Sequence, residues 1–249
     1  MAHVLIATDL SDYALNAALY GIRLYGTEGN RFSLLNAYRS PPAPEGMPMA
    51  PDPAAQLSAD GLETFARRLL EQLPEPTPDL ATVSAYGALS NVIEDLCEGP
   101  EPPDLVVMGT HGASGLERAL MGSTTAALIR SGSAPILAVP VHARYQDPKR
   151  IILADDGGMV DRATLKVLVD IARWSRSEVL IVHVVPESQE SESAFGSSYD
   201  VQLGAIPHTF HSVIGHDVLQ ALNDLVNQSE TDLAVVVHRN RGLIERLFH

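Results

Sequence analysis

The stretch "VVMGTHGASGLERALMGSTTAALIR", residues 106–130, decides how the first half of this chain folds. Its opening apolar run is typical of a buried strand, and its closing pattern is typical of a helix. Between them stand Gly109, Gly112 and Gly122, whose missing side chains let a ligand approach the backbone. Gly109 would also let the chain turn sharply as it leaves the strand. The stretch therefore predicts a strand, a ligand-binding loop and a helix.

The predicted helix begins with the residues Gly122, Ser123, Thr124 and Thr125. Free N–H groups and the positive end of the dipole at a helix start form a site for anions, and the hydroxyls add donors. A P-loop would carry a lysine in the pattern G-x(4)-G-K-[ST], and this stretch has none. We therefore expect a phosphate to be held mainly by backbone amides and hydroxyls, with Arg118 either helping or pairing with Glu117.

Short apolar runs alternate with amphipathic stretches through the rest of the first half. The predicted strands are residues 3–9, 32–37, 81–86, 104–109 and 135–139, and the predicted helices are residues 12–25, 53–72, 91–98 and 123–131. The strand runs are nearly continuous in apolar residues, as in strands covered on both faces. The alternation predicts a doubly wound parallel α/β sheet, with a ligand site outside the carboxyl ends of the strands.

The second half of the chain resembles the first. VLIATD at residues 4–9 is similar to IILADD at residues 151–156, and DLVVM at residues 104–108 is similar to DLAVV at residues 232–236. We predict two copies of one unit, at residues 1–142 and 150–249. The offset between the copies falls from 147 to 128 residues along the chain. The second copy is therefore expected to lack about one helix between its second and fourth strands.

The end of the first predicted strand supplies a second group of candidate residues, Ala7, Thr8 and Asp9. Asp9 suits a ribose hydroxyl or a base edge, and it equally suits a turn or the N-cap of the following helix, for which Ser11 and Asp12 compete. Ala37, at the end of the second strand, either lines an adenine pocket or is a core alanine. His111 either reaches a phosphate or lies exposed to water.

Composition excludes some partners. The net charge of −14 argues against nucleic acid, whose phosphates would be repelled. Cys97 is the single cysteine, so no intrachain disulfide forms, as is usual in a reducing compartment. The start of the chain does not read as a signal peptide, and no run of 18 apolar residues could span a membrane. We expect a cytoplasmic protein without a membrane partner.

The sequence gives little support for a metal site or for hydrolase activity. His208 and His211, with His216 and His238 further on, come nearest to a metal cluster, but a spacing of three places the first two on opposite faces of a strand. The sequence has no G-x-S-x-G nucleophile elbow, so we assign no catalytic residue. Trp174 and the apolar positions of residues 164–173 are interpreted as ordinary helix packing.

The spacing G-x-x-G-x(9)-G-S, from Gly109 to Ser123, resembles the nucleotide-binding signature of the universal stress protein family. The resemblance extends to IATDLSD at residues 6–12 and to SAPILAVP at residues 133–140. It implies a five-stranded parallel sheet of order 3-2-1-4-5, a tandem arrangement known in the family, and binding of ATP or another adenine nucleotide. A divalent ion such as Mg²⁺ could accompany the triphosphate, although no protein ligand set for it is evident.

The resemblance also assigns roles to residues. Asp9 and Ala37 would border the adenosine, Met108 and Gly109 would line the adenine and ribose side, and the phosphates would lie against the glycines and hydroxyls of the loop. The full predicted nucleotide site comprises Ala7, Thr8, Asp9, Ala37, Met108, Gly109, His111, Gly112, Gly122, Ser123, Thr124 and Thr125.

The second copy departs from this pattern. Val237 and Asn240 replace the first two loop glycines, and the counterpart of Gly122 would follow His249. We expect no second anion site and no fifth strand there, although Asp156 keeps the place of Asp9. In the family the fifth strand commonly pairs units. Residues 136–139 could therefore form a homodimer, or the two halves could pair within one chain.

Three functions stay open from the sequence. The first is a nucleotide-binding regulatory protein of the stress response, which the intact glycine loop favours. The second is a nucleotide-using enzyme, at most a weak ATPase, and the third is an interaction module without a ligand. Neither the signal nor the protein partner can be predicted.

Overall fold

The computed structural model describes residues 1–40, 52–110, 123–155, 160–185, 196–214 and 230–237. The chain divides into two compact units, residues 1–145 and residues 146–249. No described helix combines the length and the apolar character needed to cross a membrane.

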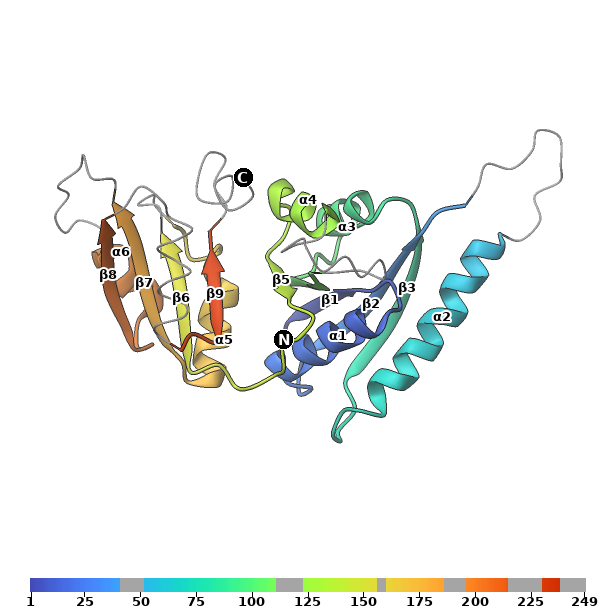
Figure 1. Ribbon diagram of the computed structural model, residues 1–249, viewed down its shortest axis with the longest axis horizontal. Coiled ribbons are helices and arrows are strands. Elements are labelled where there is room, and N and C mark those ends of the chain that lie inside the picture. The colour runs from blue at the N-terminus through green and yellow to red at the C-terminus, as the bar shows by residue number, and fades with distance from the viewer. Residues whose placement is uncertain (41–51, 111–122, 156–159, 186–195, 215–229, 238–249) are drawn as a thin grey trace. The chain divides into compact units, whose positions relative to one another are not determined.

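The first unit is a five-stranded parallel sheet with described helices on both faces (Figure 1). Its strands are β1 (His3–Ala7), β2 (Arg31–Tyr38), β3 (Asp79–Tyr86), β4 (Leu105–Gly109) and β5 (Ile136–Val139). Its helices are α1 (Asp12–Tyr25), α2 (Pro53–Leu70), α3 (Leu89–Glu98) and α4 (Ser123–Ser131). The strand order β3-β2-β1-β4-β5 confirms the predicted fold and order.

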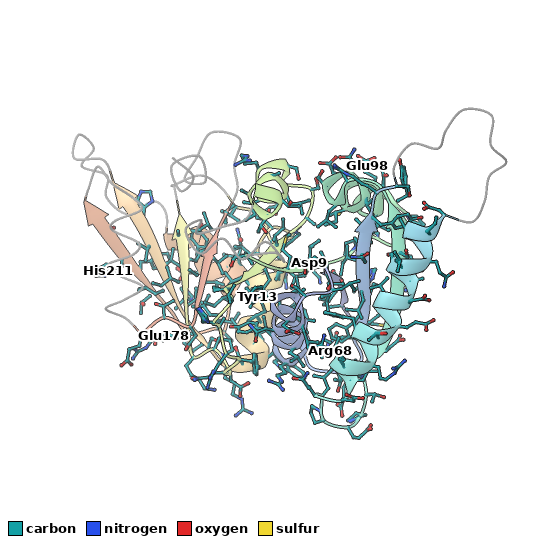
Figure 2. The ribbon with its side chains drawn as sticks, turned by 45° about the vertical axis from the view of Figure 1, so that its right-hand side comes forward. Asp9, Tyr13, Arg68, Glu98, Glu178 and His211 are labelled. Carbon is teal, nitrogen blue, oxygen red and sulfur yellow. The ribbon has the colours of Figure 1, made fainter. Side chains whose placement is uncertain are left out.

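Apolar side chains cover both faces of the central strands, as the sequence predicts. On one face, α3 and α4 pack on a cluster of buried residues: Leu5, Ala7, Leu35, Val92, Ile93, Val106, Met108 and Leu128. On the other face α1 lies so close to β4 that a Cβ built on Gly21 would be 2.9 Å from Val107. Helix α2 covers β2 and β3 beside α1, and its Arg68 contacts Asp12 of α1 at 2.6 Å (Figure 2).

The expectation of strands covered on both faces is wrong for β3. This strand stands at the edge of the sheet and pairs only with β2, from Arg31 opposite Asp79 to Tyr38 opposite Tyr86. Several of its residues are exposed, including Tyr86. An edge strand has a neighbour on one side only, so the surrounding helices cover it less completely.

The second unit has a smaller parallel sheet of order β8-β7-β6-β9 (Figure 1). Its strands are β6 (Arg150–Asp155), β7 (Glu178–Val185), β8 (His208–Ile214) and β9 (Leu233–Val236), and its described helices are α5 (Lys166–Ser175) and α6 (Gly196–Leu203). The order is that of the first four strands of the first sheet. A second, smaller parallel sheet in the second half of the chain is thus confirmed.

The second copy is shorter between its second and fourth strands, as expected, although the crossover from β7 to β8 keeps a helix, α6. Residues 39–78, 40 in number, separate β2 from β3, whereas residues 186–207, 22 in number, separate β7 from β8. The next connections, residues 87–104 and 215–232, are equal at 18 residues. The shortening therefore lies in one crossover, where α6 has 8 residues and α2 has 18.

Trp174 corrects a second expectation, because it does not pack in the core. Helix α5 buries Leu168, Val169, Ile171, Ala172 and Ser175. These positions form one face of the helix, and residue 174 lies outside it. Trp174 is 61% exposed.

His208 of β8 is held by acceptors at both ring nitrogens. Nδ1 lies 2.8 Å from the Ile206 carbonyl oxygen, and Nε2 lies 2.8 Å from Asp200 Oδ1. The hydrogen bond to Ile206 is the main cause that raises the pKa of His208, and Asp200 adds to it against the opposing effect of burial. The arrangement suits the protonated imidazolium, which donates from both nitrogens.

The second unit should therefore lose stability as the pH rises. Stabilisation by protonated His208 is complete below its unfolded pKa of about 6.5 and disappears as the pH passes the higher folded pKa. We expect a decrease on the order of 1 kcal/mol in the free energy of unfolding, since Asp200 is 64% exposed. Urea unfolding across this pH range measures the decrease.

His208→Gln should remove this pH dependence of stability, and His211→Gln, at an exposed position of the same strand, should retain it. Equal slopes for His208→Gln and the unaltered chain would contradict the assignment.

Candidate functional site

The candidate site lies at the carboxyl ends of β1 and β4, where the strand order reverses. The two strands are adjacent and parallel, with Val4 opposite Leu105 and Ile6 opposite Val107. In doubly wound sheets the crevice at this reversal is the usual ligand site. The side chains of Ala7 and Met108 belong to the buried cluster under α3 and α4, with Ala37 packed against it. These three residues are therefore apolar core residues near the carboxyl ends of their strands.

The turn from β1 into α1 is fixed by its own polar side chains. Thr8 Oγ1 accepts a hydrogen bond from the Leu10 amide at 2.9 Å, and Asp9 Oδ1 accepts one from the Ser11 amide at 3.1 Å. Ser11 then caps α1 by accepting from Ala14 N at 3.2 Å. Ser11 is thus the N-cap among the candidates, and Asp9 is an exposed turn residue (Figure 2).

Leu10 carries backbone strain at the centre of this turn. Its φ is 67°, in the left-handed region that a leucine seldom adopts. Such a conformation costs about 1–3 kcal/mol and persists where the surroundings enforce it. Helix α2 supplies part of that enforcement, because a Cβ built on Gly61 would lie 2.5 Å from Leu10 Cδ1. The absence of a side chain at Gly61 lets the helix approach the turn.

A chain of polar side chains connects the same turn to α2 and β3. Asn36 Nδ2 donates to the Thr8 carbonyl oxygen at 2.8 Å, and Asn36 Oδ1 accepts from Ser58 Oγ at 2.8 Å. Ser84 Oγ lies 2.7 Å from Ser58 Oγ. Sequence reasoning missed these residues, although an asparagine inside the apolar run of residues 32–37 was a usable signal.

The two sides of the glycine loop meet in the structure. The Thr125 hydroxyl donates to the Gly109 carbonyl oxygen at 3.3 Å, which joins the first turn of α4 to the end of β4. Gly109 is still part of β4 and pairs with Val139, so the sharp turn expected at this glycine does not occur there. The amide of the next residue, Thr110, continues the ladder by donating to the Val139 carbonyl at 3.0 Å.

Some predicted site residues cannot be placed. His111, Gly112 and Gly122 lie outside the described residues, as does Asp156 of the second unit. Ser123 begins α4, and Thr124 follows it with an exposed side chain. Thr125 is buried. The structure brings together Ala7, Thr8, Asp9, Met108, Gly109 and Thr125 at the ends of two adjacent strands and the start of α4.

Within the described ranges, no group of three or more His, Cys, Asp or Glu residues is arranged to hold a metal ion. His208 is engaged by Asp200 and Ile206, as described above. The described residues of the candidate site thus provide hydrogen-bonding and apolar groups, and no cluster of metal ligands.

These features define a doubly wound α/β protein with a glycine-rich loop between β4 and α4, at the point where strand order reverses. A sequence model of the universal stress protein family matches residues 1–140, more than half of the chain. The chain therefore belongs to the universal stress protein family.

Similar proteins agree with this membership. A universal stress protein of Methanocaldococcus jannaschii is 28% identical over 141 residues, which cover 55% of this chain and 80% of that relative. The crystal structure of a universal stress protein from Archaeoglobus fulgidus has a TM-score of 0.72 at 15% identity, covering 94% of this chain and 86% of that one. A functionally unknown protein of Pseudomonas aeruginosa has a TM-score of 0.60 at 17% identity, covering 100% and 85%. These two structural similarities establish the fold alone.

Proposed function

We propose that the first unit binds ATP or another adenine nucleotide and that the protein acts as a regulatory protein of the stress response. The observation that carries the proposal is the contact between Thr125 and Gly109. It holds the start of α4 against the end of β4, beside the turn that carries Asp9. A helix N-terminus and a carboxylate then lie at one crevice, as a nucleotide with charged phosphates and ribose hydroxyls requires.

The described residues fit an adenine nucleotide. Asp9 is exposed and can accept from a ribose hydroxyl, while Thr124 is exposed in the first turn of α4. The apolar residues Ala7, Ala37 and Met108, near the carboxyl ends of their strands, would lie next to the base. Gly112, Gly122 and Ser123 would supply backbone amides to the phosphates. Mg²⁺ would be held by phosphate oxygens, with any protein contribution secondary.

Nucleotide binding should stabilise the first unit and saturate at one ATP per chain. A ligand that binds only the folded state adds stability of about 2.7 kcal/mol at a concentration one hundred times its Kd, so the melting temperature should rise measurably. Calorimetry with ATP, ADP and AMP gives the stoichiometry and the preferred nucleotide. A stoichiometry of two would overturn the assignment to the first unit alone.

The competing functions predict different results in the same experiment. A weak ATPase would release phosphate from bound ATP, whereas a regulatory protein would retain the nucleotide unchanged. An interaction module would show no shift in melting temperature with any nucleotide. Phosphate release and melting, measured on one preparation, therefore separate the three.

Residues 150–249 are proposed to be a degenerate second copy of the same unit. The order β8-β7-β6-β9 and the similar runs at residues 4–9 and 151–156 support this. We infer no nucleotide site there and propose that it serves a structural or partner-binding role. Cytoplasmic location and pairing through β5 or between the two halves stay predictions.

A further inference from the structure

We propose that Asn36 is a positioning residue for the nucleotide site, and that α2 acts through it to hold the β1–α1 turn in its binding conformation. This inference rests on the proposed function. It concerns a residue outside the predicted nucleotide site, since Asn36 contacts the Thr8 carbonyl oxygen, next to the exposed Asp9.

The Asn36 side chain takes over a backbone role where β1 leaves the sheet. The Thr8 amide donates to the Leu35 carbonyl at 2.8 Å, which is the last ladder bond from β1. In a parallel ladder the Thr8 carbonyl would next accept from a backbone amide of β2. It accepts instead from Asn36 Nδ2 at 2.8 Å. The side chain therefore fixes the peptide that joins Thr8 to Asp9.

The orientation of the Asn36 amide follows from the chemistry of its partners. A carbonyl oxygen can only accept, so the Thr8 carbonyl requires the Nδ2 group to face it. Oδ1 then faces Ser58 Oγ at 2.8 Å, and the Ser58 hydroxyl must donate. Ser58 Oγ is left to accept from Ser84 Oγ at 2.7 Å. The chain of donors thus runs in one direction, from β3 through α2 to the turn.

Two residues on one face of helix α2 support the turn, one through Asn36 and one by direct contact. Ser58 reaches it through Asn36, and Gly61, three residues later, lies against the side chain of Leu10. Residues three apart on a helix are neighbours on the same face. Leu10 has a φ of 67°, and these two contacts help to hold its backbone in that conformation. The position of Asp9, between Thr8 and Leu10, follows from both contacts.

The decisive variant is Asn36→Asp, with Asn30→Ala as its matched control. Aspartate keeps an acceptor for Ser58 but cannot donate to the Thr8 carbonyl. Asn30 also holds backbone carbonyls, those of Tyr25 and Gly26, but at the amino end of the sheet. Asn36→Asp removes the hydrogen bond donated to Thr8, while Asn30→Ala removes its two donated bonds and the bond that Asn30 Oδ1 accepts from the Ala2 amide at 2.9 Å. Only the first should disturb the nucleotide site.

We expect Asn36→Asp to raise the Kd for ATP about tenfold, the factor for one hydrogen bond of ordinary strength. Asn30→Ala should leave the Kd within about twofold, although it also destabilises the unit. Without nucleotide, Asn36→Asp should speed hydrogen exchange at the Leu10 and Ser11 amides, and Asn30→Ala should not. If Asn36→Asp does not fold, Ser58→Ala should give the same faster exchange and a smaller loss of affinity.

The readouts separate this inference from the proposed function. Absence of ATP binding by the unaltered chain would defeat the nucleotide proposal, while the exchange of the Leu10 and Ser11 amides would still test the positioning role. Unchanged exchange at these amides, or an unchanged Kd in Asn36→Asp, would overturn the inference. Equal losses of affinity in Asn36→Asp and Asn30→Ala would also overturn it, because they would follow from lost stability alone.

Discussion

Replacing Leu62 with alanine should lower the free energy of unfolding of the first unit by about 2–5 kcal/mol, the range for leucine-to-alanine changes in a protein core. Leu62 lies on the buried face of α2 and is 1% exposed. Its removal takes apolar surface out of the core and leaves a cavity between α2 and the sheet. Urea unfolding followed by circular dichroism measures the loss, and hydrogen exchange of β2 assigns it to the first unit.

Leu57 supplies a matched control on the same helix. It is 72% exposed, so Leu57→Ala should change stability by no more than about 0.5 kcal/mol. The two variants share the residue type, the helix and the substitution, and they differ only in burial. A comparable loss in both variants would mean that α2 does not pack on the sheet through Ser58, Leu62, Phe65 and Leu69 as described.

Much of the first unit could be predicted from local sequence. Helix α1 begins at Asp12 as expected, because Ser11 caps it, and it ends where Gly26 takes a φ of 73°. Short apolar runs predict the central strands, because buried parallel strands are apolar on both faces. The strand order came from the family resemblance, and the structure confirms it.

The remaining features depend on contacts between distant residues. Asn36 and Ser58 are 22 residues apart, and no spacing rule links them. Residue type alone predicts packing for Trp174, but its place on α5 decides its exposure. The offset between the two copies predicts the shorter second unit, but it does not tell which of two crossovers is shortened. At Gly109 the glycine pattern predicted a turn, yet pairing with Val139 keeps this residue in the strand.

The same limit applies to the candidate site. Sequence identified the residues at the ends of β1 and β4, since these ends follow from the strand assignment. It could not show that Thr125 is buried against Gly109 or that Thr124 is exposed, because both are hydroxyl residues at one helix start. Two adjacent threonines therefore have different proposed roles, Thr125 in joining α4 to β4 and Thr124 at the phosphates.

Gly122→Val should abolish nucleotide binding by the first unit. Gly122 stands immediately before Ser123, where α4 begins, and a branched side chain there would block the approach of phosphate to the free amides of the helix. A hydrogen bond to a charged group contributes about 1.5–3 kcal/mol. Loss of two such bonds raises the Kd by roughly 100-fold or more. Calorimetry with ATP measures the change.

Asp156→Ala is the control, because it alters the place in the second unit that matches Asp9 and should leave ATP binding intact. The melting temperature of Gly122→Val without nucleotide is measured beside that of the unaltered chain, so that a loss of binding is distinguished from a loss of folding. ATP bound by Gly122→Val with an unchanged Kd would mean that the phosphates lie elsewhere. Affinity lost in Asp156→Ala would place the second unit in the site. The start of α4 is the phosphate site only if the first variant fails to bind and the second binds normally.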